Sequence, residues 1–194
     1  TLYKACARAP WNAVSELLVH VLRGLERLHS HDIYQGALNP RDLYVQGGGQ
    51  RKLARLADPG LEDLRELHQL FGDQVNPWAL APEVVAGRDH DRRSDLYSFG
   101  LMFYELCCRH HPFEKKSDRH IVAPRELKGT LPKSFEQTIL KLLSEQAEDR
   151  YPTANSVIRE LSSASKKRYT VEPKQSRLST VYPVNWTGHE ETLG

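Results

Sequence analysis

The sequence predicts a mainly helical domain of the α+β class, with one or two short β-hairpins. Apolar residues between 14 and 28 recur at spacings of three and four, which is the pattern of one buried helix face. Residues 101–108 form an almost unbroken apolar run, as expected for a helix that is buried on all sides. Two further apolar runs, Leu43–Val45 and Leu53–Leu56, flank the glycines at 47–49 and predict a hairpin.

The rest of the chain adds shorter helices and a polar end. A helix is expected at residues 2–9, where Pro10 ends it, another at about 134–144 and a last one near 153–162. After residue 163 the chain becomes polar and contains prolines. We therefore expect one domain at 1–165 and a tail at 166–194 that is extended, disordered or strapped along the domain by its aromatic residues.

Length and composition are those of a globular domain with a core. The chain has 194 residues, of which 39% are hydrophobic and 27% are charged. Its formal net charge is +2, and the basic and acidic residues are interspersed rather than grouped in blocks. This charge pattern favours neither nucleic acid nor a membrane surface as a partner.

The cysteines indicate a reducing compartment. There are three of them, Cys6, Cys107 and Cys108, and an odd number with two adjacent residues does not predict a disulfide framework. No apolar run reaches the roughly 18 to 20 residues that a membrane-spanning helix needs, and the first residues lack the order of a signal peptide. The expected location is the cytoplasm, with the nucleus as the alternative. The chain begins with Thr1, so processing or excision from a longer chain stays open.

The segment Ile33–Val45, which follows a helix ending in Leu28 and His29, resembles the catalytic loop of a protein kinase. Downstream, Asp58-Pro59-Gly60 stands where kinases carry Asp-Phe-Gly, and Ala81-Pro82-Glu83 matches the Ala-Pro-Glu triplet. The resemblance extends from about residue 2 to 161 and implies the fold of the large, C-terminal lobe of a kinase. The strands, Gly-rich loop and Lys–Glu pair of the small lobe have no counterpart in this sequence.

The matched loop departs from the kinase pattern at the positions that carry chemistry. In the family, a His-Arg-Asp triplet supplies the catalytic base, and a Lys and a metal-binding Asn follow it. The residues at these positions here are Gln35, Gly36 and Ala37 for the triplet, Asn39 for the Lys and Asp42 for the Asn. Because Ala37 offers only a methyl group, the resemblance predicts a pseudokinase that is not an enzyme.

Metal and nucleotide binding are expected to be weak or absent. Asp58 matches the magnesium-binding Asp of the family, and Asp42 is expected to lie near it, so two carboxylates could hold Mg²⁺. The alternatives are an ordinary turn at Asp58 and two solvated carboxylates. The glycines at 47–49 do not predict a phosphate loop, because no helix that starts with Lys and Ser or Thr follows them.

Four further residues are expected to hold the lobe together. In the family, the residue at Asp95 binds the catalytic-loop backbone, Gly100 permits close packing, and Arg150 pairs with Glu83.

Cys107, Cys108, His110 and His111 have the residue types of a zinc site. Adjacent cysteines on a helix point about 100° apart, so core packing is the favoured interpretation.

These observations lead to one function and two alternatives. The favoured function is a catalytically inactive pseudokinase module that binds protein partners as a scaffold or regulator, the partner being a kinase, a kinase small lobe or a large assembly. One alternative is an enzyme that a small lobe completes in trans, or that uses Asp42 and Asp58 for metal-dependent nucleotide transfer. The other alternative is a purely architectural subunit of a large assembly.

Overall fold

The computed structural model describes residues 6, 9–35, 38, 43–46, 53–56, 80–113, 121–165 and 167–171 of the chain. Over these ranges the molecule is mainly helical, as predicted, and contains a two-stranded sheet. The elements in chain order are α2 (Trp11–His29), β1 (Leu43–Gln46), β2 (Leu53–Leu56), α4 (Pro82–Val85), α5 (Arg92–Cys108), α6 (Pro124–Leu127), α7 (Lys133–Leu142), the 3₁₀ helix η4 (Ala147–Asp149) and α8 (Ala154–Ser165).

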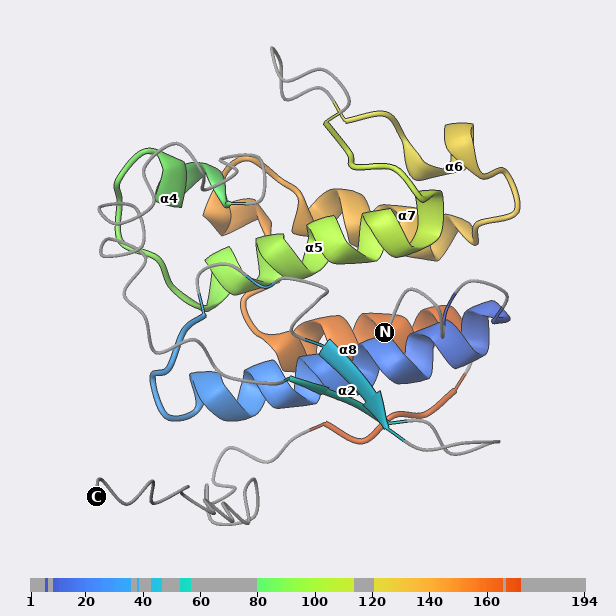
Figure 1. Cartoon of the computed structure of the whole chain (residues 1–194), viewed down its shortest axis with the longest axis horizontal. Coiled ribbons are helices and arrows are strands. Elements are labelled where there is room, and N and C mark those ends of the chain that lie inside the picture. The colour runs from blue at the N-terminus through green and yellow to red at the C-terminus, as the bar shows by residue number, and fades with distance from the viewer. Residues whose placement is uncertain are drawn as a thin grey trace, which may run out of the picture.

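The long helices pack in two pairs. Helix α2 lies along α8, and α5 lies along α7, while contacts between α7 and α8 join the pairs (Figure 1). The hairpin of β1 and β2 packs against α2. Buried side chains from all of these elements form one continuous hydrophobic core. The start of α5 and the end of α2 therefore belong to the same buried framework.

Helix α2 begins and ends slightly outside the range predicted from its apolar face. Pro10 is its N-cap in an extended conformation, and Ser30 is its C-cap. Leu18, Leu22 and Leu25 are fully buried on the face that meets the core. The chain reverses at Asp32, which has a φ of 55°. This reversal carries the backbone from the end of α2 back towards α5.

Helix α5 is buried on all sides, as its apolar run predicted. Only Arg92, Arg93 and Glu105 of its residues are not buried. Its N-cap Asp91 accepts a hydrogen bond from the Arg93 amide at 2.7 Å, and the Asp91 amide donates one to Oγ of Ser94 at 3.3 Å. Such a capping box satisfies amides that would otherwise lack partners at the helix start.

Gly100 allows α5 and α7 to approach closely. A Cβ atom at this position would lie 2.8 Å from the Cβ of Leu142 and 3.1 Å from a methyl of Leu143. Carbon atoms in van der Waals contact lie about 3.5 to 4.0 Å apart. Any side chain at position 100 would therefore push the two helices apart.

The predicted hairpin is present. Strands β1 and β2 are antiparallel, with Leu43 opposite Leu56 and Gln46 opposite Leu53. Leu43 and Ala54 are buried, which fixes the register because a shift by one residue would turn the buried set outward. The glycines at 47–49 that were expected to form its turn lie outside the described residues. The helix expected at 2–9 is described only at Cys6 and Ala9.

The chain after α8 is described for residues 167–171, which lie against α2. Arg23 donates hydrogen bonds to Thr170, and Lys167 pairs with Glu16. Tyr169 is half-buried and packs against the core. The predicted boundary between a domain at 1–165 and a tail at 166–194 stays a prediction. In the part of the chain that the structure describes, no helix is both long and apolar enough to span a membrane.

Candidate active site

Asp95 connects three elements near the start of the segment that resembles a catalytic loop. It lies in the first turn of α5 and is fully buried. One carboxylate oxygen, Oδ2, accepts the backbone N–H of Gln35 at 3.0 Å and lies 2.7 Å from Nε2 of His29. The carboxylate therefore ties the loop start at Gln35 to both α5 and the last residue of α2.

His29 is a site residue that the sequence reasoning did not single out. Because a carboxylate only accepts hydrogen bonds, the contact with Asp95 places the proton on Nε2 of the imidazole. The ring of Tyr34 lies between His29, tilted to it at a centroid distance of 5.7 Å, and His90, which it meets edge to face at 6.4 Å. The sequence spacing could have predicted that His29 is buried, because His29 follows Leu25 by four residues and so extends the buried face of α2.

Glu83 and Arg150 form the second buried polar centre. The guanidinium makes two parallel hydrogen bonds to the carboxylate, from Nη1 to Oε1 at 2.7 Å and from Nη2 to Oε2 at 2.8 Å. Its remaining donors bind the backbone carbonyls of Ser144, Arg93 and Glu145 at 2.9 to 3.1 Å. The pair that the family resemblance implied is thus present and fully hydrogen-bonded, and it fixes α4 to the start of α5 and to η4.

The electrostatics of this pair favour the charged form of Glu83. Burial alone would raise the pKa of the carboxyl, but hydrogen bonds from Arg150 and from Ser94, whose Oγ donates at 2.7 Å, lower the pKa below its ordinary value. The ring of Tyr97 lies 4.8 Å from the guanidinium carbon of Arg150 and covers its face. A buried charge pair with this many hydrogen bonds is costly to break.

A polar hollow of about 180 Å³ lies beside the pair. Glu83, Arg88, Asp91 and Glu148 are among the residues that line it. Both signs of charge occur around it, and Nη1 of Arg93 lies 3.8 Å from Oε1 of Glu148. No single charge dominates the hollow, so its composition indicates no particular ligand.

Most of the sequence-predicted loop residues lie outside the described residues. Gly36, Ala37, Asn39 and Asp42 belong to this group, and so does Asp58. The metal site expected at Asp42 and Asp58 therefore stays a prediction. Of the triplet only Gln35 is described, and its side-chain Oε1 is buried without a hydrogen-bond partner in the described part of the chain.

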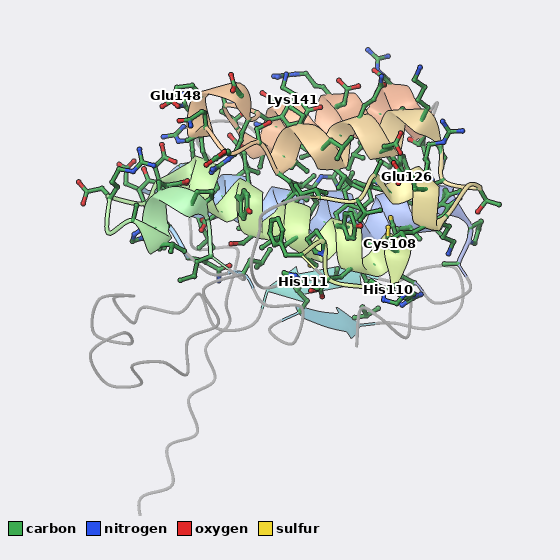
Figure 2. All side chains as sticks on the ribbon, turned by 90° about the horizontal axis from the view of Figure 1, so that it is seen from above. Cys108, His110, His111, Glu126, Lys141 and Glu148 are labelled. Atoms are coloured by element: carbon green, nitrogen blue, oxygen red, sulfur yellow. The ribbon has the colours of Figure 1, made fainter. Side chains whose placement is uncertain are left out.

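The two cysteines at the end of α5 pack in the core, whereas His110 is exposed and His111 is half-buried. Cys107 is fully buried, and its pKa is raised mainly by burial; Cys108 donates a weak hydrogen bond to the Pro124 carbonyl at 3.8 Å. Figure 2 shows His110 near the end of α5 that carries Cys108, and Nε2 of His111 lies 3.8 Å from Oε1 of Glu105 within the helix. Among the described residues no cluster of His, Cys, Asp and Glu could hold a metal ion.

Comparison with known proteins places these features in one family. A model of the protein kinase domain matches residues 3–178. The chain is 31% identical over 152 residues to the DNA damage-responsive serine/threonine-protein kinase RqkA of Deinococcus radiodurans, covering 72% of this chain and 22% of RqkA. It is 28% identical over 165 residues to the tyrosine-protein kinase MasK of Myxococcus xanthus, covering 76% of this chain and 25% of MasK. The chain thus spans about a quarter of these relatives.

Solved structures agree on the fold. The PknI kinase domain of Mycobacterium tuberculosis, as a double mutant, superposes with a TM-score of 0.64 at 20% identity, over 84% of this chain and 61% of that one. The unmutated PknI kinase domain gives a TM-score of 0.60. The predicted protein kinase fold, with the mainly helical content of the large lobe, is therefore confirmed.

The same findings overturn the expectation that the chain is not an enzyme. The family match and the relatives named as serine/threonine and tyrosine kinases point to an enzyme. The prediction gave Ala37 too much weight, because phosphoryl transfer depends mainly on positioning and charge neutralisation, of which the base is one part. Gln35, Gly36 and Ala37 nevertheless stand in the sequence, and any mechanism has to work with them. The chain belongs to the protein kinase domain family.

Proposed function

We propose that this chain is the large lobe of a kinase that transfers the γ-phosphoryl group of ATP to a protein, in combination with a small lobe. The observation that carries the proposal is the contact between Asp95 and the Gln35 amide at 3.0 Å. A buried carboxylate fixes the backbone where the catalytic loop begins. The kinase relatives support assigning this framework to phosphoryl transfer.

In this proposal the chain contributes positioning and negative charge. Asp58 and Asp42 would supply the hard oxygen ligands for Mg²⁺, which would neutralise charge on the phosphates when bound. Asp95 and the Glu83–Arg150 pair hold the loop and α4 in place. Ala37 cannot accept the proton of the attacking hydroxyl, so the proton leaves to water. Loss of a general base typically slows a reaction by about 10² to 10⁴-fold, and we expect a correspondingly slow enzyme.

The test is transfer of labelled phosphate from ATP in the presence of Mg²⁺ to the chain itself and to a basic protein substrate. The 194-residue chain is assayed alone and with an added protein kinase small lobe. We expect slow labelling with the small lobe present, and loss of labelling in Asp58→Asn. The matched control is Asp149→Asn, an exposed carboxylate on η4. Equal labelling in wild type and Asp58→Asn, or none in any preparation, would contradict the proposal.

Metal binding can be measured separately from transfer. If Asp42 and Asp58 hold Mg²⁺, adding the ion raises the melting temperature of the chain, because a ligand that binds only the native state stabilises it. The Asp58→Ala variant should lose this response. An unchanged melting temperature in the wild-type chain would remove the metal from the proposal.

A second candidate function is regulation through protein binding, with another kinase or a kinase small lobe as the partner. The substituted triplet at 35–37 favours it, because the framework around these positions is kept while the usual side chains are not. Capture of the tagged chain from cells, quantified by mass spectrometry against a charge-matched control protein, tests this role. Recovery of a kinase or small lobe supports regulation, whereas a large stoichiometric assembly without a kinase favours an architectural role.

The cytoplasmic location stays a prediction. Cys6, Cys107 and Cys108 are buried thiols. Thiols are compatible with the reducing compartment that the cysteine content predicted.

A further inference from the structure

We propose that Thr170 is a phosphorylation site and that Arg23 on α2 binds the resulting phosphate, which clamps residues 167–171 to the lobe. The modifying enzyme would be a serine/threonine kinase that selects basic sequences, with ATP as the phosphate donor. This inference does not depend on the phosphoryl transfer proposed for the chain itself.

The side chain of Arg23 already converges on Thr170. Its Nε and Nη2 donate to the carbonyl oxygen of Thr170 at 3.2 and 2.8 Å, and Nη2 also lies 2.7 Å from the hydroxyl Oγ1. Thr170 itself is exposed. The hydroxyl that would carry the phosphate is therefore reachable from solvent and lies next to Nη2 of a guanidinium, a group that can bind phosphate through two parallel hydrogen bonds.

The residues before Thr170 fit a kinase that reads positive charge. Lys166, Lys167 and Arg168 are consecutive in the sequence, and the last two are exposed. Kinases select substrates partly by such charge patterns. Residues 167–171 are neither helix nor strand, so the segment can adopt the extended form that a kinase cleft accepts.

Beyond the hydrogen bonds from Arg23 and the half-buried ring of Tyr169, the contacts that hold the unmodified segment to the lobe are weak. Lys167 pairs with Glu16 between exposed side chains, and such pairs contribute little. The amide of Tyr169 donates to Oγ of Ser162 at 3.3 Å. The Tyr169 hydroxyl is buried without a partner in the described part of the chain, and an unsatisfied hydroxyl weakens the attachment.

Phosphorylation would strengthen the attachment of residues 167–171 to α2 by adding negative charge opposite Arg23. Oγ1 of Thr170 attacks the γ-phosphorus of ATP, its proton passes to the base of the modifying kinase, and the bond to the β,γ-bridging oxygen breaks to release ADP. The product carries about −1.5 to −2 charges and three acceptor oxygens. Opposite Arg23 these oxygens form hydrogen bonds in which donor and acceptor are both charged, and such bonds are stronger than the one that the neutral hydroxyl now accepts from the guanidinium.

The first test asks whether Thr170 is a substrate. The catalytic subunit of cAMP-dependent protein kinase is incubated with the 194-residue chain, with its Thr170→Ala variant and with a free peptide of residues 164–176, and the sites are mapped by fragmentation mass spectrometry. We expect phosphate on Thr170 in both chain and peptide, with rates within about tenfold. Labelling of the peptide but not of the 194-residue chain would show that the lobe hides Thr170. Labelling of neither would show that the kinase does not recognise the sequence. Either result would overturn the proposal.

The second test asks whether Arg23 binds the phosphate. Phosphothreonine is placed at 170 by protein ligation, and hydrogen exchange is followed at the Tyr169 amide. We expect exchange to slow by about tenfold on phosphorylation. The effect should disappear in Arg23→Ala and persist in Arg159→Ala, which removes an exposed arginine from α8. No slowing, or equal slowing in Arg23→Ala, would overturn the assignment of Arg23.

Discussion

Both ends of α5 contribute buried side chains, but those side chains differ in their chemistry. At the first turn, Ser94 and Asp95 place polar groups in the interior, and both are hydrogen-bonded to residues outside the helix. At the last turn, Leu106, Cys107 and Cys108 contribute mainly apolar volume. The difference shows that the two ends of this buried helix have different roles. Its start positions the candidate active site, and its end packs in the core.

The largest expected effect comes from breaking the polar end. Replacing Arg150 with Met leaves the Glu83 carboxylate buried without its partner, which typically costs about 3 to 5 kcal/mol of unfolding free energy. Urea unfolding followed by circular dichroism measures the loss. Arg159→Ala is the matched control on an exposed surface and should change little. A cost below about 1 kcal/mol for Arg150→Met would mean that the pair does not hold the lobe together.

A smaller loss is expected where α5 packs against α7. Gly100→Ala brings a Cβ to 2.8 Å from the Cβ of Leu142, and overpacking of this kind costs about 1 to 3 kcal/mol. The control is Gly129→Ala, where the nearest atom would lie at 3.9 Å. Equal melting temperatures for the two variants would contradict the close approach of the helices.

The polar end should also make the unfolding free energy depend on pH in the acidic range. The pKa of Glu83 is lowered in the folded chain, below the value of about 4.3 that is usual for an unfolded Glu. Its contribution is therefore fully present above that value and is lost as the pH falls through the folded pKa. Unfolding free energies measured from pH 7 to pH 3 should fall more steeply in wild type than in Glu83→Gln. Parallel pH profiles would show that Glu83 is not the group responsible.

The thiols at the apolar end of α5 should be unreactive in the native chain. Burial raises the pKa of Cys108 to about 11, so only about one thiol in a thousand is ionised at pH 8. Labelling with a disulfide reagent should leave Cys107 and Cys108 unmodified in the native chain and modify them after unfolding. Rapid native labelling that disappears in Cys108→Ser would mean that this end of α5 opens to solvent.

The apolar end was also the easier one to predict. The spacing of apolar residues indicated the buried face of α2, and an almost unbroken apolar run indicated the buried α5, because both patterns are local. The turn-length helices α4 and α6 were missed, since four residues carry too little periodicity to register. The first turn of α2 was missed as well, because Trp11 and Ala13 are only partly buried.

The polar end required information that local sequence does not hold. The contact between His29 and Asp95 joins residues 66 positions apart, and that between Glu83 and Arg150 joins residues 67 apart. The second pair and the role of Asp95 came from the family resemblance, and His29 from neither source. Weighing single substitutions also misled: Ala37 suggested an inactive chain, whereas the relatives point to an enzyme.

The fixation of the candidate active site by Asp95 is tested most directly by hydrogen exchange at the Gln35 amide. This N–H donates to the buried carboxylate at 3.0 Å. We expect slow exchange in the wild-type chain and exchange about tenfold faster in Asp95→Asn, because the amide is a weaker acceptor than a carboxylate. Rapid exchange in wild type, or the same rate in both proteins, would contradict the claim that α5 holds the loop in place.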